Sequence, residues 1–267
     1  AAFLSKSDLA TGMVTEFTEL QGEMGKEYAL LDGEKPEVAQ AIFEQYMPRF
    51  AGDILPQQEI GRALSLADKL DNLAATFLRG LIPTGSQDPF ALRRQTIGAV
   101  NILTDGKIHW DIRRGIEAAL ALLPGDEETK ETVLSKIEDF FRQRIKAIML
   151  DEGIAYDIID SVLAGPVDDI YALFLKARSM TESQLKDEAE LRQAITRLAN
   201  ITKGKTGGKV DPSLFTEDVE KKLQDAFEAV SAKALPLFAS YEYGKALPAL
   251  KELTAPINDY LDNVMVM

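Results

Sequence analysis

The sequence predicts an all-α protein, and three observations carry this prediction. Apolar residues recur at the three- and four-residue spacing of amphipathic helices in one segment after another. Strand signals are nearly missing, since the chain has no Asn-Gly hairpin turn and no sustained alternation of apolar and polar residues. Proline and glycine fall between the periodic segments, where connections between helices are expected.

The first half of the chain predicts five helical segments in order. Residues 3–16 carry apolar side chains near helical spacing, and Pro36 begins a further helix that Pro48 and Gly52 end. Residues 58–81 give the longest pattern, because one stripe holds Ile60, Leu64, Ala67, Leu70, Leu73 and Phe77. Helices over 89–104 and 111–123 follow, and Gly106 and the pair Pro124-Gly125 stop them.

The second half predicts a further set of helices around one basic loop. The helical segments are 129–151, 157–163, 168–180 and 181–202, then 212–235, 243–252 and 256–267. Residues 203–209 between them form a glycine-rich loop. We place a domain boundary at Pro124-Gly125, which gives domains 1–124 and 125–267.

Composition limits the class of protein. The chain has 267 residues, 46% of them hydrophobic and 27% charged, as in soluble globular proteins. It has no cysteine, which excludes disulfides and thiolate metal sites and fits a reducing compartment. No apolar run approaches the length of a membrane span. The chain lacks an initiator Met and ends on apolar side chains, so we expect both ends to be cuts in a longer chain.

The net charge of −13 argues against non-specific nucleic-acid binding by the surface as a whole, but not against local basic clusters. One such cluster lies in residues 82–94, a Pro/Gly/Ser turn that leads into a helix. We expect Asp88 to be its N-cap and Pro89 its first helical residue. Arg93 and Arg94 then lie near the helix start, where an anion is favoured, and we expect Arg113 and Arg114 to join them in one cluster. The alternative is a solvated helix start.

Two more clusters lie in the second half. Arg142 and Arg144 are on the helix over 129–151, and Arg197, Lys203 and Lys205 lie on and after the helix that precedes the basic loop. Phosphate contacts by such cations supply much of the affinity for RNA. The alternative is that these cations are solvated surface side chains around a flexible loop and have no ligand.

The basic loop also contains Gly204-Lys205-Thr206, which suggests a nucleotide-binding P-loop. That motif requires a glycine five residues before Gly204, where this chain has Ala199, and it requires a preceding strand rather than a helix. The nucleotide interpretation of this loop therefore fails.

The sequence of residues 83–94, PTGSQDPFALRR, resembles a signature of the beta subunit of bacterial glycyl-tRNA synthetase. The resemblance continues in blocks along the chain, at residues 20–25, 46–53, 66–71, 156–160, 197–201 and 258–267. It implies a C-terminal part of that subunit, in a cytoplasmic ligase of protein biosynthesis. It also implies tRNA-Gly and the alpha subunit as partners, in an assembly of two alpha and two beta chains. ATP and Mg²⁺ would be used by the alpha subunit, with no cofactor and no catalytic residue in this part.

The resemblance also implies a domain order. The first domain would be a degenerate HD-like helical domain. The second would be a helical-bundle anticodon-binding domain like that of arginyl-tRNA synthetase. By this resemblance Arg197, Asn200 and Lys203 are the first candidates for contact near the anticodon, and Arg142 and Arg144 the second. Unstacked loop bases are what proteins read in RNA.

Two alternatives are an HD-type metal-dependent phosphohydrolase and a non-catalytic helical scaffold for subunit assembly. Active HD enzymes bind metal with a His, a His-Asp pair and a distant Asp, but here Ser7-Asp8 stands where the pair would fall. Asp68 and Asp71 match the segment that holds the distant Asp. The alternative to metal binding is that such carboxylates form ion pairs with Lys6, Lys69 or Arg62. His109, the one histidine, lies well away from both segments. We therefore expect no metal site, and we expect His109 to pack or hydrogen-bond.

Overall fold

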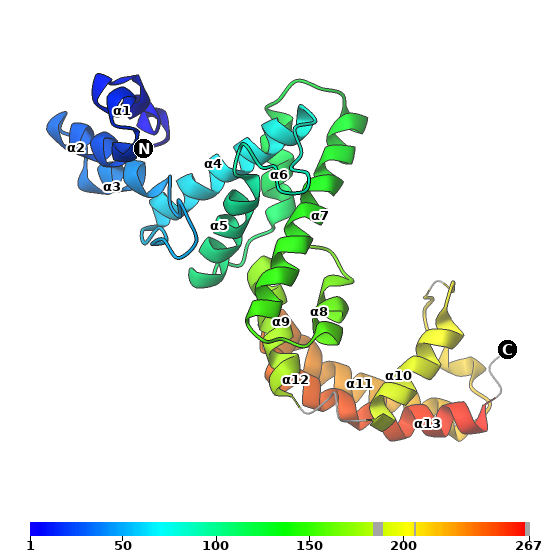
Figure 1. Cartoon of the computed structure of the whole chain (residues 1–267). Helices are drawn as coiled ribbons and strands as arrows, with labels where there is room; N and C mark the ends of the chain where they lie inside the picture. Colours follow the sequence, from blue (N-terminus) through cyan, green and yellow to red (C-terminus); the bar gives the residue numbers. More distant parts are fainter. Residues whose placement is uncertain (184–188, 206, 265–267) are drawn as a thin grey trace. The chain divides into compact units, whose positions relative to one another are not determined.

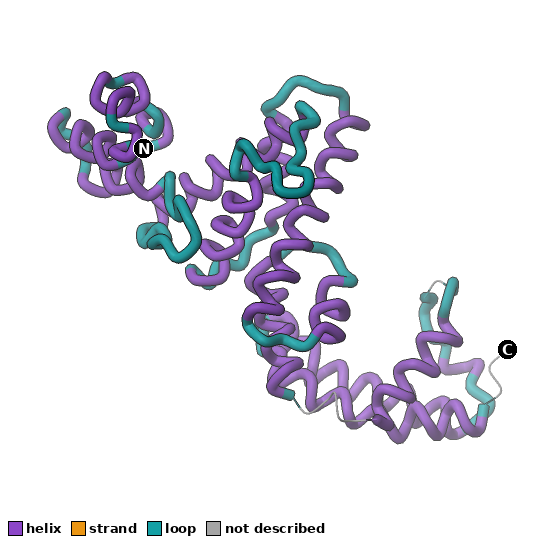
Figure 2. Tube along the Cα trace, viewed as in Figure 1, coloured by secondary structure: helices purple, strands orange, loops and turns teal. Residues whose placement is uncertain are grey.

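A computed structural model describes residues 1–183, 189–205 and 207–264, and within them every regular element is a helix (Figure 1, Figure 2). The only extended pairings there are two isolated bridges, Thr84 with Gln87 and Asp111 with Asp169. The predicted all-α class is confirmed. Expectations for residues 184–188, Thr206 and residues 265–267 lie outside the described residues. No helix in the described ranges is both long and apolar enough to cross a membrane.

The chain forms two compact units. The first holds residues 1–153 and 163–173, and the second holds residues 154–162 and 174–267. The expected boundary at Pro124-Gly125 lies inside the first unit, because α7 (Glu127–Asp151) packs against α4, α5 and α6. The division into domains 1–124 and 125–267, with their HD-like and anticodon-binding character, stays a prediction.

Helix α4 (Glu59–Leu78) is the centre of the first unit. It contacts α3 (Pro36–Glu44), α5 (Leu92–Asp105), α6 (Ile112–Ala121) and α7. Leu70, Leu73 and Phe77 of the predicted apolar stripe of α4 are buried, whereas Ile60 and Ala67 are exposed, and Leu66, outside that stripe, is buried. The rings of Phe77 and Phe140 of α7 meet edge to face, with centroids 5.2 Å apart.

The N-terminal segment differs from its expectation. Instead of one helix over residues 3–16, the structure has two short 3₁₀ helices (Ala2–Leu4 and Ser7–Ala10) and then α1 (Gly12–Glu16). Thr11 has extended backbone angles, and its hydroxyl accepts the N–H of Val14, so it starts a new helix. Helix α2 (Glu23–Leu31) follows and packs against α3.

The start of α5 was also predicted wrongly. The helix begins at Leu92, its N-cap is Ala91, and Ala91 has a left-handed φ of 53°. Asp88 and Pro89 belong to a turn closed by the Ala91 N–H donating to the Asp88 carbonyl at 3.0 Å. Asp88 still caps the helix from outside, because its carboxylate accepts the N–H groups of Leu92 at 2.8 Å and Arg93 at 3.0 Å.

The second unit is built around α11 (Asp218–Ala239), which contacts α12 (Tyr243–Ala249) and α13 (Thr254–Asn263). Helix α10 (Ala189–Thr202) packs on α13. The small core includes Ala194, Val230, Ala246 and Ile257. Helices α8 (Tyr156–Leu163) and α9 (Ile170–Glu182) lie between α7 and α10 in the chain and belong partly to each unit.

The helix expected over residues 212–235 begins later than the pattern indicated. Residues Pro212–Leu214 form a 3₁₀ turn, and α11 begins at Asp218 behind a capping box made by Glu217 and Glu220. The helix also continues through Pro236 to Ala239, because packing against α12 and α13 outweighs the loss of one backbone hydrogen bond.

Candidate nucleic-acid interface

Arg93 of α5 and Arg144 of α7 lie close enough for their charges to interact. The pKa of Arg144 is lowered, first by burial and then by the positive charge of Arg93, while Asp88 acts in the opposite direction. Arg144 stacks its guanidinium 3.6 Å from the centre of the Phe140 ring, which holds it in place. The contact between α5 and α7 brings these two cations together although they are far apart in the sequence.

The hydrogen-bond partners of this pair are neutral. Arg93 donates to the carbonyl of Gly85 at 2.7 Å, and Arg144 donates to the side-chain oxygen of Gln143 at 2.9 Å. Neither residue makes an ion pair within the described part of the chain. The carboxylate of Asp88 is occupied by the N–H groups that begin α5. Two guanidinium groups that repel each other electrostatically thus have no carboxylate bonded to either, which is an arrangement that favours a bound anion.

Arg94 lies on another side of the same helix start. It is exposed, and it donates one hydrogen bond to the carbonyl of Arg49 at 3.1 Å. Among the described residues it too has no acidic partner. A guanidinium has five N–H donors, so most of those on Arg94 are available to a ligand.

Arg142 has a structural role that the sequence did not indicate. It donates to the carbonyls of Leu163 and Gly165, and its Nε lies 3.6 Å from a carboxylate oxygen of Asp139. Arg142 and Arg144 are two residues apart on one helix, which places them on different sides of α7. The structure therefore does not bring these two predicted residues together.

Arg197 is tied to α13. It donates to the Asn258 side chain at 3.2 Å, and it forms an ion pair with Asp262 at 2.7 Å. Asn200, Lys203 and Lys205 are exposed at and after the end of α10. Gly204 has a φ of 75° and turns the chain between the two lysines. The second unit therefore presents these three side chains to solvent, while a neighbouring acid neutralises Arg197.

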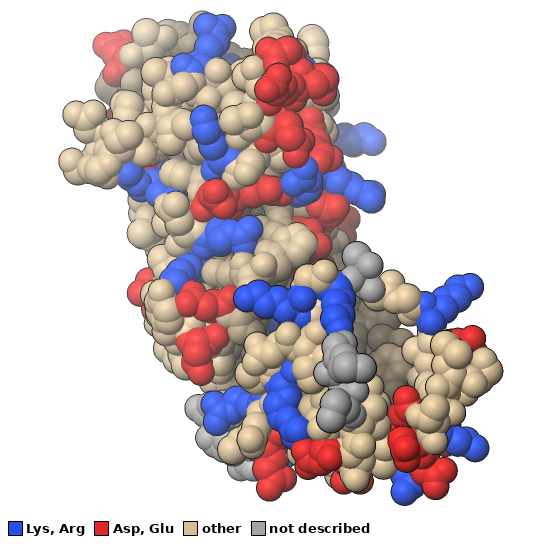
Figure 3. Space-filling model, turned by 90° about the vertical axis from the view of Figure 1, so that its right-hand side faces the viewer, with Lys and Arg blue, Asp and Glu red and all other residues tan. Residues whose placement is uncertain are grey.

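Arg113 and Arg114 are neutralised as well. Arg113 lies within 2.9 Å of Glu117, Glu131 and Glu138, and its hydrogen bonds to Glu131 and Glu138 raise its pKa. Arg114 pairs with Asp111 at 3.2 Å. On the face drawn in Figure 3, lysine and arginine side chains are interspersed with aspartate and glutamate rather than gathered in one continuous patch.

The carboxylates matched to an HD metal site have other partners. Asp68 forms an ion pair with Lys6 at 2.8 Å. Asp8 is buried and accepts the N–H of Gly22 at 2.7 Å and the hydroxyl of Tyr46 at 3.2 Å. Arg62 lies 3.8 Å from Asp105 rather than beside Asp71. Over the described ranges, no three such acids or histidines gather as they would around a metal ion.

Lys69 was expected to pair with an acid, but it is buried and bonds to neutral oxygens instead. Its ammonium donates to the Met47 carbonyl at 2.8 Å and to the Ser65 hydroxyl oxygen at 2.7 Å. Burial lowers the pKa of Lys69 to about 8. The sequence holds no signal for this, because a lysine beside Asp68 on an amphipathic helix is usually solvated.

His109 joins two distant segments of the first unit. Its Nδ1 lies 2.7 Å from a carboxylate oxygen of Asp169, and its ring packs against Tyr171 with centroids 4.9 Å apart. This is the hydrogen-bonding and packing role expected for it, and it holds the loop before α6 against the start of α9.

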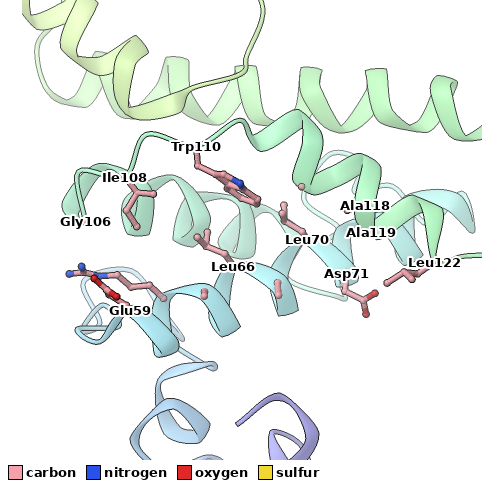
Figure 4. A pocket seen from close by; sticks show the side chains of 14 residues that line it. Glu59, Leu66, Leu70, Asp71, Gly106, Ile108, Trp110, Ala118, Ala119 and Leu122 are labelled. Carbon is pink, nitrogen blue, oxygen red and sulfur yellow. The ribbon is translucent and has the colours of Figure 1, made fainter. Parts of the chain in front are cut away.

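An apolar groove of about 740 Å³ runs between α4 and α6. In Figure 4 the side chains of Leu66 and Leu70, both on α4, point toward Trp110, and Glu59 and Asp71 lie toward the ends of the groove. A Cβ on Gly115 would lie 2.3 Å from the Trp110 ring, so glycine there lets the ring lie against α6. The groove offers few donors to phosphate, and we do not assign it to the nucleic-acid interface.

Comparison with known proteins identifies the family. The family model described as glycyl-tRNA synthetase beta subunit matches residues 1–164. The glycine–tRNA ligase beta subunit of Clostridioides difficile (strain 630) is 46% identical over 268 residues, which cover all of this chain and 39% of that protein. Those of Desulforamulus reducens and Shouchella clausii are 41% and 42% identical, with the same shares covered.

The chain spans 39% of the length of these curated relatives. The family expected from the sequence of residues 83–94 is confirmed. Since the family model matches more than half of the sequence, the chain belongs to the glycyl-tRNA synthetase beta subunit family.

Proposed function

We propose that this chain is a tRNA-binding part of the beta subunit of glycine–tRNA ligase. In this role it positions tRNA-Gly for glycylation by the alpha subunit, which uses ATP and Mg²⁺. The chain contributes binding energy and orientation rather than catalytic groups, and holding a substrate in its reactive geometry can itself supply a large share of a rate. The complete enzyme would be a cytoplasmic assembly of two alpha and two beta chains.

The observation that carries this proposal is the pair Arg93 and Arg144. In a chain of net charge −13, two guanidinium groups on the packed helices α5 and α7 repel each other electrostatically and have no bonded carboxylates. A phosphate bridging them would relieve their mutual repulsion and accept charge-assisted hydrogen bonds from both. Lys203 and Lys205, exposed after α10, are the cations of the second unit that we assign to RNA contact.

The residues are assigned to RNA contact in two groups. Arg93, Arg94 and Arg144 contact phosphates from the first unit. Asn200, Lys203 and Lys205 lie beside the anticodon in an anticodon-binding domain, where an amide side chain can bond a base edge. Arg142 and Arg197 support these surfaces by fixing neighbouring segments.

The phosphohydrolase alternative is not proposed further. Lys6 pairs with Asp68, and Asp8 accepts a backbone N–H and a tyrosine hydroxyl, so neither carboxylate is placed to share a metal ion.

The test is equilibrium binding of fluorescent tRNA-Gly to the full chain and to single variants. We expect Arg93→Gln and Arg144→Gln each to weaken binding by about tenfold, because each removes a charged hydrogen bond to phosphate. Arg114→Gln is the matched control, since this exposed cation is already paired with Asp111. Equal affinities of wild type, Arg93→Gln and Arg144→Gln would refute the assignment.

A further inference from the structure

A polar cavity of about 440 Å³ opens in the first unit, apart from the apolar groove. Its walls come from the N-terminal segment, the turn that follows α3, one side of α4 and the start of α5. This volume is within the range of small-molecule sites in proteins. Neither the proposed RNA contacts of Arg93 and Arg144 nor any of the comparisons accounts for it.

The cavity wall carries more positive than negative charge. Its cations are Lys6, Arg49, Lys69 and Arg94, and its only carboxylates are Glu19 and Asp68. Arg49 also has a partner outside the wall, because it forms an ion pair with Asp53 at 3.0 Å. The wall therefore stays net positive in a chain whose net charge is −13. Such a local reversal of charge selects an anionic ligand.

Lys69 is the most buried of these cations, with 3% of its surface exposed. Within the described residues its ammonium bonds only to neutral oxygens, those of Met47 and Ser65 and more weakly Gln45 at 3.5 Å. Its pKa of about 8 leaves it mostly protonated at neutral pH. A buried charge without a bonded counter-charge is costly, and an anion in the adjoining cavity would offset that cost.

The backbone of α5 leaves room for the side chain of Lys69. A Cβ on Gly98 of α5 would lie 3.0 Å from Cε of Lys69 and 3.1 Å from the Pro48 ring. Glycine at this position therefore lets α5 pass close to the lysine stem. Across the cavity, the amides of Asn72 and Gln95 bond to each other at 3.2 Å and add donors and acceptors beside Arg94.

We propose that this cavity binds a phosphate-bearing ligand of nucleotide size, with Arg94 donating to the phosphate and Lys69 supplying a buried positive charge behind it. A guanidinium fork matches two phosphate oxygens, and the amides can bond a base or sugar. A free mononucleotide and the terminal nucleotide of an RNA share this chemistry. The site includes neither Arg93 nor Arg144, and it specifies the ligand of Arg94, which is assigned above to RNA phosphates, as the phosphate of a nucleotide or of an RNA end.

The experiment is calorimetric titration of the full chain with adenosine monophosphate, with adenosine, and with a 5′-phosphorylated RNA tetranucleotide. We expect a phosphorylated probe to bind and adenosine to bind at least about tenfold more weakly, because only the phosphate engages the cations. Binding of the monophosphate assigns the site to a free nucleotide. Binding of the tetranucleotide alone assigns it to an RNA end.

Two variants locate the binding. Arg94→Gln, at an exposed position, should weaken binding of the phosphorylated probe about tenfold, while Arg114→Gln should leave it unchanged. Lys69→Met should weaken it further, with circular dichroism to show that the variant is folded. Failure of both phosphorylated probes to bind, or equal binding by Arg94→Gln and wild type, overturns the proposal. The affinity of the Arg93 and Arg144 variants for tRNA-Gly is a separate measurement and is not decided by this result.

Discussion

Lys69 is the residue whose environment departs furthest from what its type predicts. Lysine side chains usually reach solvent, yet this one is enclosed between α4, α5 and the turn after α3 and bonds to neutral oxygens. Its position next to Asp68 in the sequence pointed to an ion pair, but Asp68 pairs with Lys6 instead. Adjacent residues on a helix point about 100° apart, so one faces the interior while the other faces solvent.

The burial of Lys69 predicts a pH dependence of stability. The folded state has a pKa of about 8 against 10.5 for the free side chain. Between these values the unfolded state binds more protons, so the free energy of unfolding rises with pH. Relative to Lys69→Met, wild type should gain roughly 2 kcal/mol between pH 8 and pH 10.

Urea denaturation of both proteins across this pH range measures the difference. Tyr46 acts in the opposite direction near pH 10, because burial raises its pKa to about 12 and its ionisation there occurs mainly in the unfolded state. Taking the difference between the two proteins removes this and other titrations that they share. A difference that is constant with pH, or that shrinks as pH rises, would show that Lys69 titrates normally in the folded state.

At the scale of elements, the periodic pattern could predict most of the helices but not where each begins, and it gave no helix where the structure has α2. Helices α4 and α7 lie within three residues of the expected 58–81 and 129–151, because long apolar stripes define them. The starts of α1, α5 and α11 differ, because side chains outside the periodic pattern decide them. At α5, Asp88 reaches forward to Leu92 and Arg93, so a local motif that suggested an N-cap gives a turn instead.

The same limit applies to the candidate site. The sequence could indicate which cations have few acidic residues near them in the chain, but not which cations lie near one another in the folded protein. Arg93 and Arg144 are brought together by the packing of α5 on α7, whereas Arg142 is turned away toward Leu163 and Gly165. Ion pairs such as that of Arg197 with Asp262 join distant segments, and a single sequence holds no signal for them.

The cap of α5 gives a prediction at this scale. Asp88→Ala removes the acceptor of two backbone N–H groups and should lower the free energy of unfolding by about 1 kcal/mol. Asp88→Asn keeps an acceptor oxygen and should restore most of that loss. Chemical denaturation of the three proteins compares them, and an alanine variant as stable as wild type would show that the cap does not stabilise α5.

Across the whole molecule, the acidic balance of the chain restricts where RNA can approach. A net charge of −13 repels a polyanion, and Arg113, Arg114 and Arg197 are already paired with acids. Arg93, Arg94 and Arg144 have no bonded carboxylate among the described residues, and they are the cations of the first unit whose contacts we expect to carry affinity. Membership of the glycyl-tRNA synthetase beta subunit family makes tRNA-Gly the RNA to use.

The most direct test of this account is the salt dependence of tRNA-Gly binding by wild type and by the double variant Arg93→Gln/Arg144→Gln. Each phosphate contact adds roughly 1 to the slope of log affinity against log salt concentration. We predict that the slope of the double variant is shallower than that of wild type by about 1 to 2, and that Arg114→Gln keeps the wild-type slope. Parallel slopes for wild type and the double variant would contradict the claim that these two arginines bind phosphate.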